Sequence, residues 1–453
     1  MLSPEPAHLL APLFTTDAMR ATFSDQRRLQ GMLDFEAALA RALSRSGIAP
    51  ASAAPAITSQ CRAELFSVEA LSREAALAGN PAIPLVKHLT ALVAKSDEKA
   101  ATFVHWGATS QDAIDTGLVL QLRDALAQFD SGLAKLSDAL AQLVSARAST
   151  VAAGRTLLQQ ALPVTLGLKA AGWLDAVERH RSRLRETAAR AVVLQFGGAV
   201  GTLAALGDKG PAVAATLADE LKLPPPRIPW HAHRDRFAEV AATLGLLVGS
   251  LGKIARDISL LSQTEVAEFN EPAAPGRGGS STMPHKRNPV GSAVILAAAL
   301  RVPALVSTML AAMPQEHERG LGGWHAEWET LPEIFLLSAG ALSHATEIVA
   351  GLEIHDENIA RNLGLTHGLI LAEAIAFVLA KKIGRAPAHE LLEQACRRAL
   401  KESRPLRDIL LEDSTVRAHL SAADLERLLD PKNYIGSAEK FARDVLSARA
   451  HKP

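Results

Sequence analysis

Long apolar stripes at helical spacing are the feature that most constrains the fold of this chain. The members of the first stripe recur every three or four residues after Asp112: Leu118, Leu122, Leu126, Phe129, Leu133, Leu136, Leu140 and Leu143. A second stripe has the same spacing: Phe237, Val240, Leu244, Leu247, Leu251, Ile254, Ile258 and Leu261. Stripes sustained over so many turns are typical of long helices in a bundle. The segment "TSQD", residues 109–112, supplies N-cap candidates for the first helix.

Three more apolar segments extend this pattern. One starts near Val164, one covers residues 290–313 with an interruption at Pro303, and one spans roughly residues 332–352. A helix that is apolar on nearly all sides must be buried on all sides. We therefore expect the bundle to pack against other copies of the chain in an obligate homo-oligomer. The segment 290–313 is long enough to span a bilayer, but Arg301 near its centre favours a helix buried in protein.

The sequence predicts an all-α fold with three helical domains. Alanine and leucine dominate, tyrosine occurs once among 453 residues, and β-branched runs of strand length are scarce. We expect an N-terminal domain of shorter helices over residues 1–110 and a central long-helix bundle over 111–353. The C-terminal domain, 354–453, is broken by "GRAP" and "DPKNYIGSA".

Overall composition argues against several classes of function. The formal net charge is zero, whereas nucleic-acid and membrane-surface proteins need an excess of positive charge. The two cysteines, Cys61 and Cys396, form neither a disulfide framework nor a zinc motif, so a reducing, cytoplasmic location is expected. The N-terminus lacks the basic and apolar regions of a signal peptide. His231 and His233 flank one residue without an evident third ligand, so we expect no metal.

Four polar segments interrupt the apolar pattern: "VHWGATSQDAIDT" (104–116), "GRTLLQQALPVTLG" (154–167), "EPAAPGRGGSSTMPHKRNP" (271–289) and "QEHERGLGGWHAEWET" (315–330). The third has glycines on one side and prolines on the other, as in a hinged lid that ends at a helix start. Its hydroxyl, amide and basic side chains suit an anionic, carboxylate-bearing ligand. A solvated surface loop is the alternative interpretation.

The segment "GSSTMPHKRNP", residues 279–289, resembles the signature of the fumarase/aspartase superfamily, roughly G-S-S-x-M-P-x-K-x-N. The first two polar segments are similar to the superfamily's other active-site segments, in the same order, and the resemblance covers most of the chain. It implies an all-helical, three-domain homotetramer with a 20-helix core and active sites that three subunits share. It also implies elimination or addition next to a carboxylate, without a cofactor or a metal.

The resemblance also implies roles for individual residues. Ser280 matches the catalytic serine, and Lys286 matches a residue that stabilises the carboxylate and the developing enediolate. A serine hydroxyl is a weak base, so the site must stabilise its alkoxide. The expected substrate-binding residues are His105, Thr109, Ser110, Arg155, Thr156, Gln159, Ser281, Asn288 and Arg319. Arg155 and Arg319 could equally pair with helix carboxylates, and His105 could equally support another ligand residue.

One position departs from the superfamily pattern. Many members carry a histidine after "RT" that assists proton transfer to the leaving group, and here that position is Leu157. The bacterial 3-carboxy-cis,cis-muconate cycloisomerase branch lacks this histidine, and the polar segments resemble that branch in wording. In lactonisation the nucleophile is a substrate carboxylate, already ionised at neutral pH, so it needs no base. The resemblance thus implies ring closure of 3-carboxy-cis,cis-muconate to 4-carboxymuconolactone in protocatechuate breakdown, with Ser280 as proton donor to the α carbon.

Two alternatives stay open at this point. An adenylosuccinate-type lyase would release fumarate, and Leu157 counts against it. A non-catalytic helical bundle could reuse the fold for binding, and the intact polar loop counts against that. Release of fumarate from adenylosuccinate, or no turnover of any carboxylate, would distinguish the two.

Overall fold

The computed structural model describes residues 9–274, 276, 278–279, 282–283 and 285–450. The chain forms two compact units, which we call unit 1 (Met1–Ala134, His180–Gly252 and Val294–His344) and unit 2 (Lys135–Arg179, Lys253–Ala293 and Ala345–Pro453). Five long helices contribute residues to both units: α8 Ser110–Ala146, α9 Leu166–Ala191, α11 Asp235–Leu261, α12 Val290–Ala311 and α13 Gly323–Ala350. The all-α fold class is confirmed.

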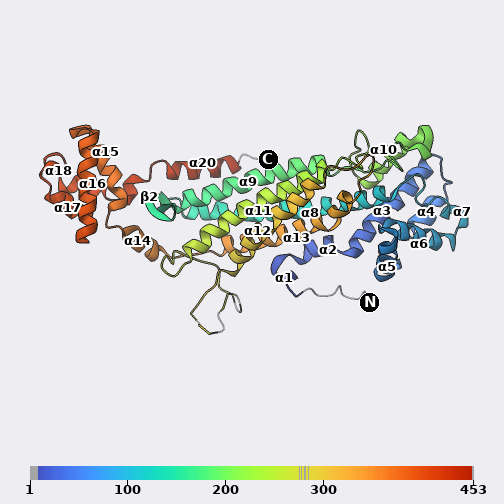
Figure 1. Cartoon of the computed structure of the whole chain (residues 1–453), viewed down its shortest axis with the longest axis horizontal. Coiled ribbons are helices and arrows are strands. Elements are labelled where there is room, and N and C mark those ends of the chain that lie inside the picture. The colour runs from blue at the N-terminus through green and yellow to red at the C-terminus, as the bar shows by residue number, and fades with distance from the viewer. Residues whose placement is uncertain (1–8, 275, 277, 280–281, 284, 451–453) are drawn as a thin grey trace. The chain divides into compact units, whose positions relative to one another are not determined.

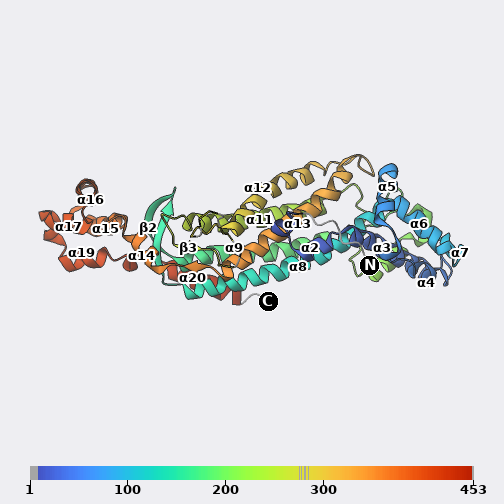
Figure 2. The same ribbon diagram turned by 90° about the horizontal axis from the view of Figure 1, so that it is seen from below.

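The two long stripes form the buried faces of α8 and α11, as predicted. Leu118 through Leu140 of the first stripe are buried, Val144 replaces Leu143 as its last buried member, and every member of the second stripe is buried. Within unit 1, parts of the long helices lie side by side (Figure 1 and Figure 2). Gly252 allows α12 to come close to α11, because a Cβ there would lie 2.9 Å from the Ala299 side chain.

Two proline-containing helices correct the sequence prediction. α12 continues through Pro303, and α13 starts at Gly323, well before Pro332. Tertiary packing thus outweighs the single hydrogen bond that each proline removes. The expectation that α12 is buried does not hold within one chain, since Leu300 is 81% and Leu310 50% exposed. By length and composition alone, three described helices, α11, α12 and α13, could cross a membrane.

Unit 1 also contains shorter elements: α1 Ala11–Phe14, α2 Asp17–Thr22, α3 Asp25–Arg45, α4 Ala53–Thr58, η1 Ala63–Leu65, α5 Val68–Ala78, α6 Ala82–Ala94, α7 Glu98–Ala101, η2 Ala204–Lys209 and α10 Gly210–Leu221. Local sequence explains their ends. The Ser24 hydroxyl accepts the Arg27 N–H at 3.2 Å at the start of α3, and α5 ends at Gly79, whose φ is 80°.

Unit 2 contains the strands, which the sequence pattern did not predict. β1 Val151–Thr156 pairs with β2 Gln159–Thr165 as an antiparallel hairpin, and β3 Phe269–Asn270 pairs with β4 Glu353–Ile354. The hairpin, drawn in teal, lies beside α14 Asp356–Gly364 (Figure 2). Short strands of mixed polarity show little alternation of apolar and polar residues, so the sequence pattern is a weak indication of a strand.

The C-terminal part of unit 2 is a group of short helices: η3 Leu369–Leu371, α15 Ala372–Ile383, α16 Arg385–Glu402, α17 Leu406–Glu412, α18 Ser414–His419, α19 Ala422–Leu428, η4 Pro431–Tyr434 and α20 Ala438–Ala450. Helices α15 to α18 surround a core that includes Ile375, Leu379 and Leu406 (Figure 1). The division into three domains stays a prediction, because the long helices contribute to both units.

Candidate active site

The N-terminus of α8 in unit 1 offers a site for an anion. Thr109 immediately precedes the helix, and Ser110 is its first residue. Both side chains are half-buried, and neither hydroxyl hydrogen-bonds to another residue in the part of the chain that the structure describes. The start of a 37-residue helix carries a partial positive charge and free N–H groups. Two unpaired hydroxyls at such a position suit a carboxylate ligand.

Asp112 holds the loops around this helix start in place. Its buried carboxylate accepts N–H groups from Thr109 at 3.0 Å, Gly197 at 3.0 Å and Gly198 at 2.9 Å. The Nε2 atom of His231 lies 2.7 Å from the same carboxylate. The side chain of His231 is therefore bound to Asp112. The loop that contains Gly197 and Gly198 is held at the start of α8 by the same carboxylate.

His105 lies on the loop before α8 and is held by Glu36 of α3. Its Nδ1 atom lies 2.5 Å from Oε1 of Glu36, whose side chain is only 1% exposed. Burial alone would lower the pKa of His105, but the charge and the hydrogen bond of Glu36 outweigh it and raise that pKa. The imidazole is also held on a backbone with φ of 59°, an uncommon conformation for histidine. The geometry therefore favours a fixed imidazolium beside the α8 N-terminus.

Arg319 adds a second positive charge at this place. Its Nε donates to Oε1 of Gln111 at 3.0 Å, and its Nη2 donates to the carbonyl of Ala199 at 3.0 Å. Both acceptors are neutral, so these bonds orient the guanidinium without cancelling its charge. The alternative interpretation of Arg319, pairing with a helix carboxylate, is not seen among the described residues.

A buried ion network lies below this surface. Arg234 donates to Asp115 of α8 at 2.6 and 3.1 Å and to Glu327 of α13. Its guanidinium also lies 5.1 Å from the Trp230 ring centroid. Burial would lower the pKa of Arg234, but the two carboxylates outweigh it and raise that pKa. Because Gln111 also donates to Asp115 at 3.1 Å, the network supports the start of α8 directly.

In unit 2, the turn of the β1–β2 hairpin is exposed and strained. Thr156 and Gln159 face each other across a two-residue turn. The turn residues Leu157 and Leu158 have φ of 49° and 66°, and their side chains are 97% and 75% exposed. The left-handed conformation costs a non-glycine residue roughly 1 kcal/mol or more. The turn therefore combines left-handed backbone with two exposed apolar side chains.

Arg155 fixes this hairpin within unit 2. Its guanidinium contacts both carboxylate oxygens of Glu268, at 2.5 and 3.2 Å, and the Glu268 side chain is 1% exposed. Asn362 of α14 donates to the same carboxylate at 2.9 Å. The charge of Arg155 is thus matched by a carboxylate, as in the alternative interpretation, but Glu268 lies just before β3 and not on a helix.

The polar loop borders a cavity of about 200 Å³, and its lining includes Asn270, Lys286 and Asn288. Lys286 is exposed, and its ammonium has no partner among the residues described. The N–H of Asn288 donates to the carbonyl of Gly278 at 2.9 Å. The predicted Ser280 and Ser281 lie outside the described residues.

The end of this loop is anchored at two points. Arg287 pairs with both oxygens of Glu353 at 2.7 and 2.8 Å, and it lowers the pKa of that carboxyl group. The carboxylate of Glu271 accepts the N–H groups of Gly291 and Ser292 at 3.0 and 2.7 Å, at the start of α12. These contacts place Lys286 and Asn288 between fixed neighbours.

Comparison with known proteins identifies the family to which this chain belongs. A family model described as "Lyase" matches residues 14–304, and one described as "Adenylosuccinate lyase C-terminus" matches residues 368–445. The chain belongs to the fumarase/aspartase superfamily. It is 58% identical to a 3-carboxy-cis,cis-muconate cycloisomerase of Pseudomonas aeruginosa, over 98% of this chain and 97% of that protein.

Solved structures of the superfamily agree with this assignment. The 3-carboxy-cis,cis-muconate lactonizing enzyme of Pseudomonas putida is 55% identical, with a TM-score of 0.94 over 98% of this chain and 99% of that one. A fumarate lyase of Mesorhizobium is 41% identical, with a TM-score of 0.89 over 96% of this chain and 99% of that one.

Within this superfamily frame, each unit brings together part of the predicted site. Unit 1 gathers His105, Thr109, Ser110 and Arg319 around the start of α8. Unit 2 places Lys286 and Asn288 at one cavity and Arg155, Thr156 and Gln159 on the hairpin. Their catalytic and binding roles stay predictions.

The sequence did not reveal the residues that hold the site in place, of which the main ones are Glu36, Asp115, Arg234, Glu268 and Glu327. Asp112 was noted only as part of the N-cap segment "TSQD". A buried charge is defined by a partner far away in the chain, such as Glu36 for His105, so a local pattern carries no signal for it.

Proposed function

We propose that this protein is a cycloisomerase that converts 3-carboxy-cis,cis-muconate into 4-carboxymuconolactone, a step in protocatechuate breakdown. The observation that carries the proposal is the near-full-length similarity to enzymes of that name in Pseudomonas. Leu157 supports it, because a residue without a transferable proton occupies the position where other superfamily members use histidine.

The described residues suit the chemistry of this substrate. One substrate carboxylate binds Thr109, Ser110 and the α8 N-terminus, beside the charges of His105 and Arg319. An oxygen of a second substrate carboxylate adds to a carbon–carbon double bond. The electron pair of that bond moves into the carboxylate conjugated with it. Lys286 and Asn288 stabilise the resulting enediolate. Ser280 then delivers one proton to the α carbon, which solvent replaces.

The apolar exposed surfaces fit a homotetramer whose active sites are shared between subunits. Leu246 of α11, together with Leu300 and Leu310 of α12, is at least half exposed in one chain. We infer that other copies cover these helices, so that they need not enter a lipid bilayer. We further infer that the hairpin turn at Leu157 and Leu158 contributes to a site on another copy.

A cytoplasmic location and the three-domain organisation complete the proposal. The similarity to bacterial cycloisomerases and the two free cysteines support the location. We place the domain boundaries near residues 110 and 353, where α8 and β4 begin.

An ultraviolet assay tests the function directly. Purified, chelator-treated protein is mixed with 3-carboxy-cis,cis-muconate, and the conjugated-diene absorbance is followed while NMR identifies the product. We expect loss of the absorbance and appearance of the lactone. The variant Ser280→Ala should lose several orders of magnitude in rate while the oligomer stays assembled. A flat trace from the folded wild-type protein, with fumarate released from adenylosuccinate instead, would contradict the proposal.

A further inference from the structure

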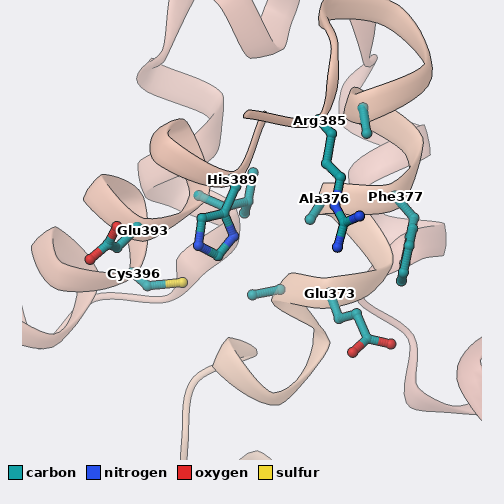
Figure 3. Close-up of a pocket in the computed structure, with 10 residues that line it drawn as sticks. Glu373, Ala376, Phe377, Arg385, His389, Glu393 and Cys396 are labelled. Atoms are coloured by element: carbon teal, nitrogen blue, oxygen red, sulfur yellow. The ribbon is translucent and has the colours of Figure 1, made fainter. Parts of the chain in front are cut away.

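A cavity of about 460 Å³ lies between α15 and α16 in the C-terminal part of unit 2 (Figure 3). Ala372, Ala376 and Ala380 line it from α15 at intervals of one helical turn, so small side chains leave the space open. Leu392 of α16 lines it on the other helix and is buried. The cavity thus has an apolar wall that a larger residue at position 376 would fill.

Two basic side chains face this cavity without a partner. Arg385 and His389 are one turn apart on α16 and both point into the space between the helices (Figure 3). Neither makes a hydrogen bond or an ion pair with any residue that the structure describes. Arg385 is also the first residue of its helix, where the helix dipole disfavours a cation. Helix stability therefore does not explain this arginine.

Several other arginines in the same group of helices are paired. Arg397 binds Glu393, and Arg398 and Arg404 each bind Glu402 and Glu412. The local surface thus supplies carboxylates for these arginines, whereas Arg385 is an open cation at the cavity.

The acidic residues of the lining are already engaged. Glu373 accepts a hydrogen bond from the Tyr434 hydroxyl at 2.9 Å, which holds its carboxylate without neutralising it, and Glu393 binds Arg397. Both carboxyl groups are turned away from Arg385 and His389 (Figure 3). Burial raises the pKa of the Cys396 thiol, so it is protonated at neutral pH and serves as apolar lining. The charge that faces the middle of the cavity is therefore that of Arg385.

The lining of the cavity adds a preference for a flat, apolar body. Phe377 borders it and is 60% exposed, which leaves an aromatic ring in water beside three alanines. An aromatic ring of a ligand can stack on Phe377, while a guanidinium binds a carboxylate through two parallel hydrogen bonds.

We propose that the cavity between α15 and α16 binds a small aromatic monocarboxylate, with its carboxylate at Arg385 and His389 and its ring against Phe377. This site is separate from the active-site residues named above and does not depend on the proposed function.

Calorimetric titration of the full-length protein with benzoate tests the proposal. We expect one saturable site per chain that persists in Lys286→Met, so that binding at the polar loop is excluded. Arg385→Gln should weaken benzoate binding by roughly tenfold or more, the size of one charge-assisted pair. Ala376→Leu should abolish it by filling the cavity.

The matched controls are Arg398→Gln, on the same helix but paired with Glu402 and Glu412 outside the cavity lining, and benzyl alcohol, which has the ring without the charge. Arg398→Gln should bind benzoate as the wild type does, and benzyl alcohol should bind more weakly than benzoate. No benzoate binding by the wild-type protein would overturn the proposal. Equal binding by the wild type, Arg385→Gln and Ala376→Leu would also overturn it. Arg385→Gln changes only an exposed side chain, so it tests the site even if Ala376→Leu does not fold.

Discussion

The two parts of the candidate active site differ in how far one chain completes them. Around the start of α8, buried carboxylates hold the surrounding loops: Glu36 holds His105, and Asp112 binds Gly197, Gly198 and His231. In unit 2, by contrast, Lys286 has no partner among the described residues and the turn at Leu157 is exposed. The first region is preorganised within the chain, whereas the second presents groups outward.

The two regions therefore differ in which contacts stabilise them. A buried network is stabilised by partners in the same chain and persists without a ligand. An exposed, strained apolar turn gains stability only when another surface covers it. We therefore expect substitutions of the buried ion network in the first region to change mainly folding stability, and substitutions in the second region to change mainly activity.

The largest effect is expected from Arg234→Met. It leaves the buried carboxylates of Asp115 and Glu327 without their cation, which should lower the free energy of unfolding by about 3–5 kcal/mol. Chemical denaturation followed by circular dichroism measures this. Arg190→Met is the matched control, because Arg190 forms an exposed pair with Glu239 and should change little. Equal stability of the two variants would contradict the claim that the buried ion network stabilises the region around the start of α8.

Lys286→Met should have a comparable effect on activity and almost none on stability. Loss of one preorganised charge that stabilises the enediolate should lower kcat/KM by roughly 100- to 1,000-fold. Unfolding should be unchanged, because the ammonium has no partner among the described residues. The two measurements are the ultraviolet assay and the same denaturation experiment. A large loss of stability would show that Lys286 holds the fold.

A smaller effect is expected from Leu157→Asn. Asparagine adopts the left-handed conformation more readily than leucine, so the hairpin itself should be at least as stable. Activity should nevertheless fall, by about tenfold, because the apolar contact with another copy is lost. Kinetics and analytical ultracentrifugation test this together. Unchanged kinetics would mean that the turn contributes nothing to a site.

The smallest effect is a change in pH dependence in Glu36→Gln. In the folded wild-type protein Glu36 raises the pKa of His105 above its ordinary value of 6.5. The stability from this pair is fully present below pH 6.5 and is lost as the pH rises through the raised pKa. Without the carboxylate, the alkaline limb of the kcat/KM profile should move to lower pH, and the stability difference should shrink at high pH. Identical pH profiles for the two proteins would remove the imidazolium from the mechanism.

The sequence predicted the helices better than the site's supports. The stripes on α8 and α11 were visible because burial on one helix face leaves a period in the sequence. The continuation of α12 through Pro303 and the β1–β2 hairpin were not, because tertiary packing decides both. The polar segments marked His105, Thr109 and Lys286 through their resemblance to a family. Glu36 and Arg234 left no local mark, since a buried charge depends on a partner elsewhere in the chain.

The most direct test of the central claim mixes two inactive variants. Ser110→Glu places a negative charge at the carboxylate site of unit 1, and Lys286→Met disables the loop of unit 2. The two chains are coexpressed with different tags, and the mixed oligomer is purified and assayed with 3-carboxy-cis,cis-muconate. If sites combine unit 1 of one copy with unit 2 of another, the mixed oligomer should form lactone although each variant alone does not. A mixed oligomer as inactive as both parents would contradict the account.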